Sequence, residues 1–90
     1  MRLASYTGQF KRDVKLVQKR GKDMGKLKTI IELLLNNQTL PRDLNDHPLK
    51  GDWKPNRDLH IEPDWILIYT PLENEVRFER TGTHSDLFTK

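Results

Sequence analysis

Hydrophobic side chains in the first part of the chain recur at the spacing of amphipathic helices. Phe10, Val14 and Val17 repeat every three or four positions between Thr7, whose hydroxyl can cap a helix, and Gly21, a natural stop. The pattern predicts one amphipathic helix between these limits.

A second helix is predicted to follow at once. Asp23 can cap its first turn, and its apolar face ends at Asn36 and Asn37. The apolar positions on that face are Leu27, Ile30, Ile31, Leu34 and Leu35. Because only residues 21–23 separate the two helices, we expect an antiparallel hairpin whose apolar faces cover a sheet.

The remaining chain changes to the two-residue period of β-strands. Residues 39–54 contain Pro41, Pro48 and Gly51, which predict a loop with a short strand near His47. Strands are predicted at 3–7, 47–49, 58–62, 65–70 and 75–81. The order β-α-α-β-β-β(-β) predicts an α+β fold in a single domain, residues 1–90. In it, one antiparallel sheet carries the N-terminal helical hairpin on one face.

The composition is that of a soluble globular chain. Hydrophobic residues make up 34% and charged residues 32% of the 90 positions, enough for one modest core. There is no cysteine, so disulfides and thiolate metal sites are excluded. No apolar run approaches the roughly 20 residues that span a bilayer, and residues 1–4 lack the apolar core of a signal peptide. We expect a cytoplasmic protein that makes no contact with membranes.

Basic residues are concentrated in the helical half. Residues 1–30 hold nine Lys or Arg and two Asp, a net charge of +7, whereas the other sixty residues carry −4. Such a surface attracts polyanions, although a solvated helix face has the same composition. The basic residues of interest are Lys11, Lys15, Lys19, Arg20, Lys22, Lys26 and Lys28.

Ionisable side chains gather where the predicted strands end. His60 and Asp64 precede a core strand, Arg80 and His84 follow the next hairpin, and His47 comes from the preceding loop. If these strands are neighbours, their ends bring the five side chains onto one surface. RNA transesterification needs such a set, because one group removes the 2′-hydroxyl proton, another protonates the departing 5′ oxygen, and a cation stabilises the phosphorane. We expect His60 and Asp64 to form the supporting imidazole–carboxylate pair.

Each of these residues also has a structural interpretation. A single histidine in a strand is most often a surface or satisfied core residue. Arg80 shares the strand parity of Phe78, which predicts a guanidinium at the end of an apolar face. It could pair there with Glu79, Glu75 or Asp86.

The aromatic residues and the possible metal ligands give weaker evidence for a function. Trp65 and Phe78 fit a core better than a base-stacking platform, whereas Phe88 has less reason to be buried. A zinc site formed by the three histidines and Asp64 is disfavoured, because no H-x-H, H-E-x-x-H or paired-ligand motif occurs. We expect no metal and no cofactor.

The chain contains, in this order, DVKLVQKRGKDMGKLK (13–28), DHPLKGDWK (46–54), RDLHIEPDWILIY (57–69) and RFERTGTHSDLF (77–88). Together these segments resemble the YafQ branch of the RelE superfamily of bacterial toxins, over essentially the whole chain. The resemblance implies a RelE-like, microbial-ribonuclease-like fold. It also implies the toxin of a type II toxin–antitoxin system, a ribosome-dependent mRNA endonuclease (mRNA interferase) that enters the A site and inhibits translation.

The resemblance assigns a site by matching residue types. The implied catalytic residues are His47, His60, Asp64, Arg80 and His84, and the implied substrate contacts are Trp65 and Phe88. The resemblance further implies that the 2′-hydroxyl attacks, leaving a 2′,3′-cyclic phosphate and a 5′-hydroxyl, and that AAA lysine codons are preferred. This route requires no metal.

Roles within that site can be assigned in part. We expect His84 as general acid, Asp64 or His47 as base with His60 in support, and Arg80 as phosphate clamp. The acid and the base could be exchanged. The carboxylates expected to favour imidazolium forms are Glu62, Asp64 and Asp86.

The expected partners follow from the same resemblance. The seven basic residues named above are expected to dock on ribosomal RNA through phosphate contacts. A cognate antitoxin is expected to hold the toxin inactive in a complex of two toxins and two antitoxins, covering the basic helices or the open sheet edge, and to provide any contact with DNA. Two alternatives are a non-catalytic RNA- or ribosome-binding module and a corepressor that acts with the antitoxin.

Overall fold

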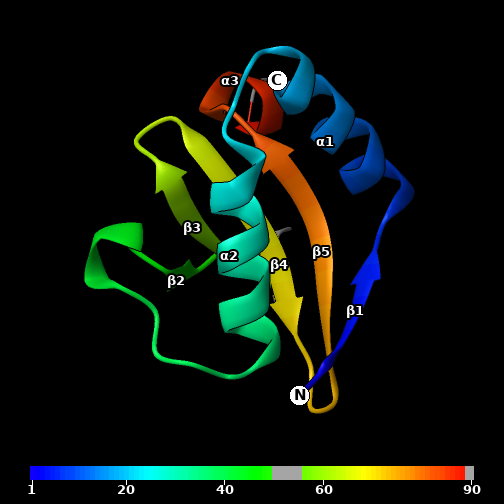
Figure 1. Ribbon diagram of the computed structural model, residues 1–90, viewed down its shortest axis with the longest axis vertical. Coiled ribbons are helices and arrows are strands. Elements are labelled where there is room, and N and C mark those ends of the chain that lie inside the picture. Colours follow the sequence, from blue (N-terminus) through cyan, green and yellow to red (C-terminus); the bar gives the residue numbers. More distant parts are fainter. Residues whose placement is uncertain (50–55, 89–90) are drawn as a thin grey trace.

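The computed structural model describes residues 1–49 and 56–88 (Figure 1). Residues 50–55 of the predicted loop, including Gly51, lie outside the described residues. The elements in chain order are β1 (Leu3–Tyr6), α1 (Gly8–Lys19), α2 (Met24–Leu35), a 3-10 turn η1 (Arg42–Leu44), β2 (His47–Pro48), β3 (Arg57–Glu62), β4 (Trp65–Pro71), β5 (Glu75–Gly82) and α3 (His84–Phe88). The α+β class and the predicted element order are confirmed.

Both long helices begin and end where the sequence predicted. Oγ1 of Thr7 accepts a hydrogen bond from the backbone N–H of Phe10 at 2.9 Å, and the Asp23 carboxylate accepts one from Gly25 at 2.9 Å. These bonds satisfy free N–H groups in the first turns. Gly21 has φ of 87° just after α1, a conformation that glycine adopts without strain. The chain ascends along α1 and descends along α2, the predicted hairpin (Figure 1).

The five strands form one sheet in the order β1-β5-β4-β3-β2. All neighbouring pairs are antiparallel except β1 and β5, which are parallel. The prediction of a wholly antiparallel sheet is therefore wrong at this pair. The alternation of residues 3–7 predicts a strand, but it contains no information about which edge the strand joins or in which direction.

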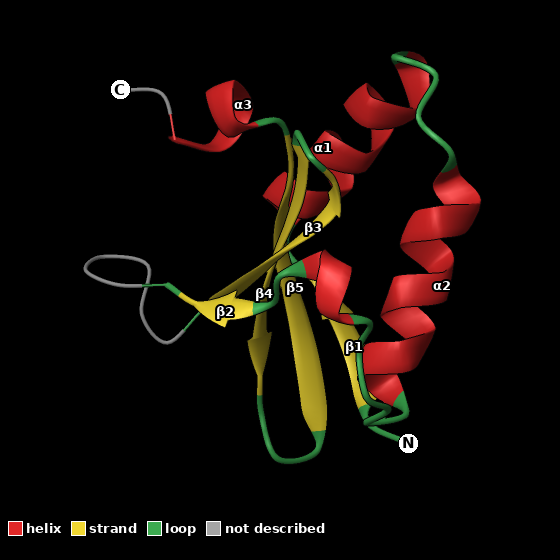
Figure 2. Cartoon of the chain, turned by 90° about the vertical axis from the view of Figure 1, so that its left-hand side faces the viewer, coloured by secondary structure: helices red, strands yellow, loops and turns green. Residues whose placement is uncertain are grey.

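The two faces of the sheet are covered differently. Val17 of α1 and Leu34 of α2 pack with Leu67 and Phe78 in the larger core cluster. On the other face, Leu87 of α3 packs with Ile66 and Ile68. Figure 2 shows the sheet close to edge-on, with α2 on one side and α3 toward the other. The face that carries α3 is therefore only partly covered by helix.

A bulge in β5 changes the side on which Arg80 lies. Tyr69 pairs with Phe78, but the next residue of β4, Ile68, pairs with Arg80, so Glu79 has no counterpart. Residues opposite each other in an antiparallel pair point to the same face. Arg80 therefore lies on the face of Ile68, and the predicted shared parity of Arg80 and Phe78 is wrong.

Candidate functional site

The three histidines meet on the sheet face that carries α3. In the strand register, His47 lies opposite Asp58, and Asp58 lies opposite Ile68. The side chains of His47 and Asp58 therefore share the face of Ile68. The ring centroid of His60 lies 6.4 Å from that of His47 and 5.5 Å from that of His84, both in edge-to-face geometry. The predicted convergence of the histidines from β2, β3 and α3 is confirmed.

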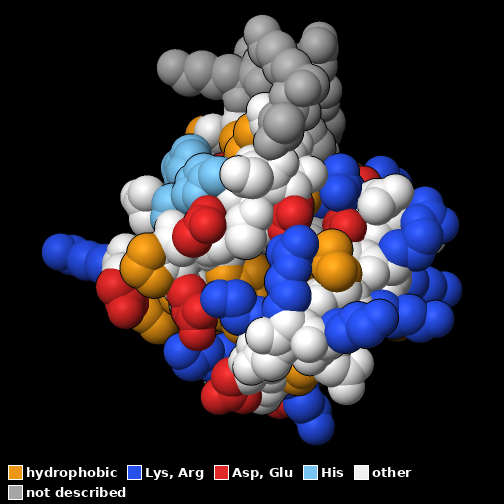
Figure 3. Space-filling model, turned by 90° about the horizontal axis from the view of Figure 1, so that it is seen from above, with side chains coloured by type: hydrophobic (Ala, Val, Ile, Leu, Met, Phe, Trp, Pro, Cys, Tyr) orange, Lys and Arg blue, Asp and Glu red, His pale blue; other side chains and the backbone are white. Residues whose placement is uncertain are grey.

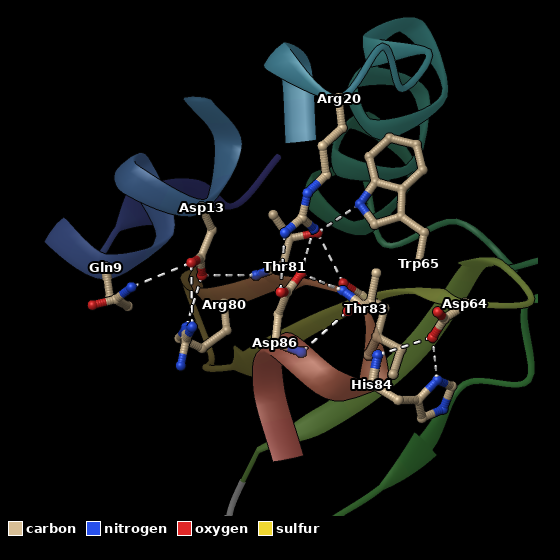
Figure 4. A network of polar contacts seen from close by, with 11 residues as sticks. Gln9, Asp13, Arg20, Asp64, Trp65, Arg80, Thr81, Thr83, His84 and Asp86 are labelled. Atoms are coloured by element: carbon tan, nitrogen blue, oxygen red, sulfur yellow. Dashed lines mark hydrogen bonds and ion pairs between the residues drawn. The ribbon is translucent and has the colours of Figure 1, made fainter. Parts of the chain in front are cut away.

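Asp64 holds His84 in one orientation. Its Oδ1 lies 2.6 Å from Nδ1 of His84 and 2.9 Å from the backbone N of the same residue (Figure 4). The hydrogen bonds from the His84 backbone N–H and the His84 side chain lower the pKa of Asp64. Because Nδ1 donates to a carboxylate, Nε2 is the ring nitrogen left to act on a substrate. The predicted pairing of Asp64 with His60 is wrong, because the turn at 63–64 faces the start of α3.

His47 is engaged at both ring nitrogens. Nδ1 lies 2.8 Å from the carbonyl oxygen of Asn45, and Nε2 lies 3.1 Å from Oδ1 of Asp58. A carbonyl only accepts, so Nδ1 donates to Asn45. The Nε2–Asp58 contact has the length of an ion pair but is not a hydrogen bond, and Oδ1 of Asp58 has no hydrogen-bond partner among the described residues. The hydrogen bond to Asn45 orients the His47 ring and places Nε2 beside the Asp58 carboxylate.

Asp58 is a site residue that the sequence interpretation missed. It is 4% exposed, and burial raises the pKa of its carboxyl, while His47 and His60 act in the opposite direction. A signal was present, because Asp58 shares the strand parity of His60 and so had to lie on the same face.

Arg80 is paired with a residue from the other end of the chain. Its Nε lies 2.7 Å from Oδ2 of Asp13 and its Nη2 lies 3.2 Å from Oδ1. Asp13 also accepts from the backbone N–H of Thr81 at 3.2 Å and from the Gln9 side chain at 3.2 Å (Figure 4). The predicted partners Glu79, Glu75 and Asp86 are wrong, because the bulge turns Arg80 toward the sheet edge beside α1.

The two predicted substrate contacts differ in accessibility. Trp65 is 0% exposed, its indole N–H donates to Oγ1 of Thr81 at 2.9 Å, and it belongs to the helix-side core. A buried indole cannot stack on a base, so its predicted substrate contact is wrong for this structure. Phe88 is 39% exposed, with its ring centroid 6.3 Å from that of His84, and it is accessible for stacking.

The basic residues fall into two groups. Arg20 pairs with Asp86, while Lys22 and Lys26 both pair with Glu62. Among the ion pairs between described residues, none involves Lys11, Lys15, Lys19 or Lys28. Figure 3 shows the histidines gathered on one side of the molecule, Lys and Arg crowded on the opposite side, and opposite charges interleaved between them.

The ion pairs of Glu62 with lysines and of Asp86 with Arg20 bear on the expectation that these carboxylates favour imidazolium forms of the histidines. Both carboxylates face Arg or Lys side chains instead of imidazoles, and of the three predicted carboxylates only Asp64 contacts a histidine. Asp58 is the second carboxylate at the cluster.

Residues 1–49 and 56–88 contain neither a clustered metal site nor a membrane-spanning helix. No group of three or more His, Asp or Glu side chains in these ranges is arranged to hold a metal ion. No helix within the same ranges has the length and apolar character needed to cross a membrane.

Comparisons with known proteins agree with this fold over nearly the whole chain. Residues 2–89 match the family model described as bacterial toxin of type II toxin-antitoxin system, YafQ. The mRNA interferase toxin YafQ of Escherichia coli K12 is 60% identical over 84 residues, which cover 92% of this chain and 91% of that protein.

Solved structures give the same result in three dimensions. The toxin in the crystal structure of the E. coli DinJ–YafQ complex superposes with a TM-score of 0.91 at 57% identity, covering 98% of this chain and 99% of that one. A metal-bound toxin from Helicobacter pylori superposes with a TM-score of 0.92 at 36% identity, covering 98% of this chain and 100% of that one. The chain therefore belongs to the YafQ family of bacterial toxins of type II toxin–antitoxin systems.

Proposed function

We propose that this toxin is an endoribonuclease that cleaves mRNA in the ribosomal A site and thereby inhibits translation. The E. coli relative that shares 60% of its residues is named an mRNA interferase. The observation that carries the proposal is the half-exposed His84 imidazole, fixed by Asp64 at 2.6 Å and next to a second imidazole, that of His60. Two adjacent imidazoles supply the base and the acid that RNA cleavage requires.

His84 serves as the general acid in this mechanism. Its Nε2 protonates the departing 5′ oxygen, and the Asp64 carboxylate stabilises the imidazolium that exists before the transfer. His60 serves as the base that removes the 2′-hydroxyl proton. The imidazole of His60 forms no hydrogen bond with other described residues, whereas His47 and Asp64 each have a hydrogen-bond partner. The products are a 2′,3′-cyclic phosphate and a 5′-hydroxyl.

Arg80 stabilises the phosphorane. Its guanidinium is oriented by Asp13 through Nε and Nη2 and remains a cation on the face that carries the histidines. Phe88, beside His84, stacks on a base of the message. The reaction uses proton transfer and a fixed cation, so none of its steps calls for a metal ion.

We propose that the toxin docks on ribosomal RNA through the lysines whose charges are not engaged within the described residues, Lys11, Lys15, Lys19 and Lys28. A cognate antitoxin holds it inactive, as a complex of two toxins and two antitoxins in the cytoplasm, and provides any DNA contact. The complex of the E. coli relative with DinJ supports this proposal. Strand β1 is an edge strand with Leu3 74% and Tyr6 43% exposed, which suits an antitoxin segment.

A cell-free translation reaction tests the activity. With the 5′ ends of the message mapped, we expect cuts that appear with ribosomes and are absent from naked mRNA. His84→Ala should lower the cleavage rate by roughly 10²- to 10⁴-fold, the contribution of a general acid, while ribosome binding persists. Glu73→Ala, an exposed change in the β4–β5 loop, is the matched control.

Two other outcomes would favour the alternatives. Inhibited translation with intact message would replace the nuclease with a non-catalytic binding module. Binding of operator DNA that requires both proteins in a gel shift would add a corepressor role.

A further inference from the structure

The connection between α1 and α2 is tied to both halves of the candidate site. Arg20, just after α1, forms a two-pronged contact with Asp86 of α3, with Nη1–Oδ2 at 2.6 Å and Nη2–Oδ1 at 3.2 Å. Lys22 and Lys26 contact the two oxygens of Glu62 at 3.0 and 2.8 Å. Thus Arg20, Lys22 and Lys26 bind one carboxylate on each side of the Asp64–His84 pair.

Asp86 connects Arg20 directly to the segment that carries His84. Oδ2 of Asp86 accepts from the backbone N–H of Thr83 at 2.9 Å, and Oγ1 of Thr83 accepts from the backbone N–H of Asp86 at 3.1 Å. This reciprocal capping fixes the first turn of α3, and His84 is the residue next to Thr83. Figure 4 shows the chain of contacts from Arg20 through Asp86 and Thr83 to His84 and Asp64.

Glu62 connects the two lysines to the segment that carries Asp64. Glu62 is the last residue of β3 and pairs with Trp65 across the turn that contains Asp64. Nζ of Lys22 also lies 5.9 Å from the centre of the Trp65 ring. A shift of residues 22–26 therefore reaches Asp64 through one strand end.

We propose that Arg20, Lys22 and Lys26 form an ion-pair brace that holds the turn bearing Asp64 against the helix bearing His84. They are positioning residues, and their charges act inside the toxin instead of on ribosomal RNA. The expected effect of the brace on cleavage rests on the proposed function. The brace itself concerns only the geometry of the His84–Asp64 contact.

We expect the brace to affect the relative position of Asp64 and His84 more than the free energy of unfolding. Its ion pairs are at least partly exposed, and such pairs contribute little to the free energy of unfolding. Cleavage is more sensitive, because a displacement of about 1 Å in a reacting group costs roughly 10²-fold in rate. The expected signature is a lower maximal rate with unchanged stability and unchanged ribosome affinity.

Glu62→Gln separates the brace from simple docking. This variant removes the partner of two lysines and leaves every basic residue in place. If the lysines only dock, cleavage is unchanged or improves, because the net positive charge increases. The brace predicts a fall of roughly 10-fold in the rate at saturating toxin, with the half-saturating concentration unchanged. Glu32→Gln, an exposed change on α2, is the matched control.

Arg20 offers a second, independent comparison. Arg20→Gln should lower the maximal rate, and Arg20→Lys should restore it only in part, because an ammonium cannot make the two-pronged contact with Asp86. Lys15→Gln should instead raise the half-saturating concentration and leave the maximal rate intact. The brace would be overturned if the two single variants, Arg20→Lys and Glu62→Gln, each kept full activity.

Amide hydrogen exchange at His84 tests the brace without any reference to cleavage. The His84 backbone N–H is donated to Asp64, so it should exchange faster in Glu62→Gln and Arg20→Gln than in the wild type and Glu32→Gln. If the wild type does not cut mRNA but these exchange rates rise, the proposed function fails and the brace stands. If the wild type cuts and the exchange rates do not move, the brace fails alone.

Discussion

Two buried carboxylates, Asp13 and Asp58, contact side chains of the candidate site. Asp13 is 6% exposed and fixes Arg80, while Asp58 is 4% exposed and fixes His47. Asp13 does not stand out in the sequence, and the signal for Asp58 is its strand parity with His60. Asp13 lies 67 positions from Arg80, and no local pattern reports a contact over that separation.

Replacing Asp58 with asparagine should change stability and activity in opposite directions. Since burial raises its folded-state pKa, the stability that Asp58 contributes is present below the ordinary carboxyl pKa of about 4 and is lost as pH rises through the raised value. Asp58→Asn should therefore be more stable than the wild type at pH 7. It should cut mRNA at least roughly 10-fold more slowly, because His47 loses the carboxylate at Nε2.

Urea unfolding at pH 7 and pH 3.5 measures the effect, and the stability gain should shrink at the lower pH. Asp43→Asn, at an exposed position, controls for loss of a carboxylate. A variant less stable than the wild type at pH 7 would show that ionised Asp58 supports the fold.

The residue types of the site were predictable, but their contacts were not. Histidines at strand ends are chemically conspicuous, and His47, His60 and His84 were identified on that basis. Asp64 pairs with His84 because α3 begins beside the turn at 63–64. That spatial relation between distant segments cannot be read from the sequence.

Helices were predicted better than strands because helical signals are local. The caps at Thr7 and Asp23 and the apolar spacing lie within the helices they define. The bulge at Glu79 and the parallel partner of β1 arise from pairing between distant strands. Arg80 was placed on the wrong face for that reason alone.

The short helix α3 depends on a glycine that precedes it. A Cβ at Gly82 would lie 2.9 Å from Oδ2 and 3.0 Å from Cβ of Asp86, and Asp86 is held by Arg20 and Thr83. Gly82→Ala should therefore displace the first turn of α3, lower the free energy of unfolding by roughly 1–3 kcal/mol and abolish most cleavage.

Urea unfolding and the cleavage rate together check this expectation. Gly8→Ala is the matched control, since its nearest atom would be at 3.6 Å, an ordinary contact. Equal stability and activity of the two variants would show that α3 tolerates the added methyl group.

In the view of Figure 3, the histidines gather on one side, and Lys and Arg side chains crowd the other side. Among the ion pairs between described residues, none involves Lys11, Lys15, Lys19 or Lys28. Under the proposed function, this separation would let lysines bind ribosomal phosphates while the imidazoles face the message. Charge reversal of Lys11, Lys15 and Lys19 should weaken ribosome association and lower the slope of log affinity against log salt by about 0.7–0.9 for each lost phosphate contact.

Binding curves at several salt concentrations measure that slope. His84→Ala should retain the wild-type slope, because it removes no docking charge. A charge-reversed variant whose affinity and slope match the wild type would reject the docking surface.

The parallel pairing of β1 with β5 sets the order in which the toxin can be completed. Leu3 is joined to Glu75 and Tyr6 to Phe78, so the first strand to be synthesised waits for the last of the five strands. Such distant pairing makes folding slow, because a long loop must close before the contact forms. A newly made chain thus passes through a period with an unpaired first strand and an unfinished His84–Asp64 contact, during which the proposed cleavage of mRNA cannot take place.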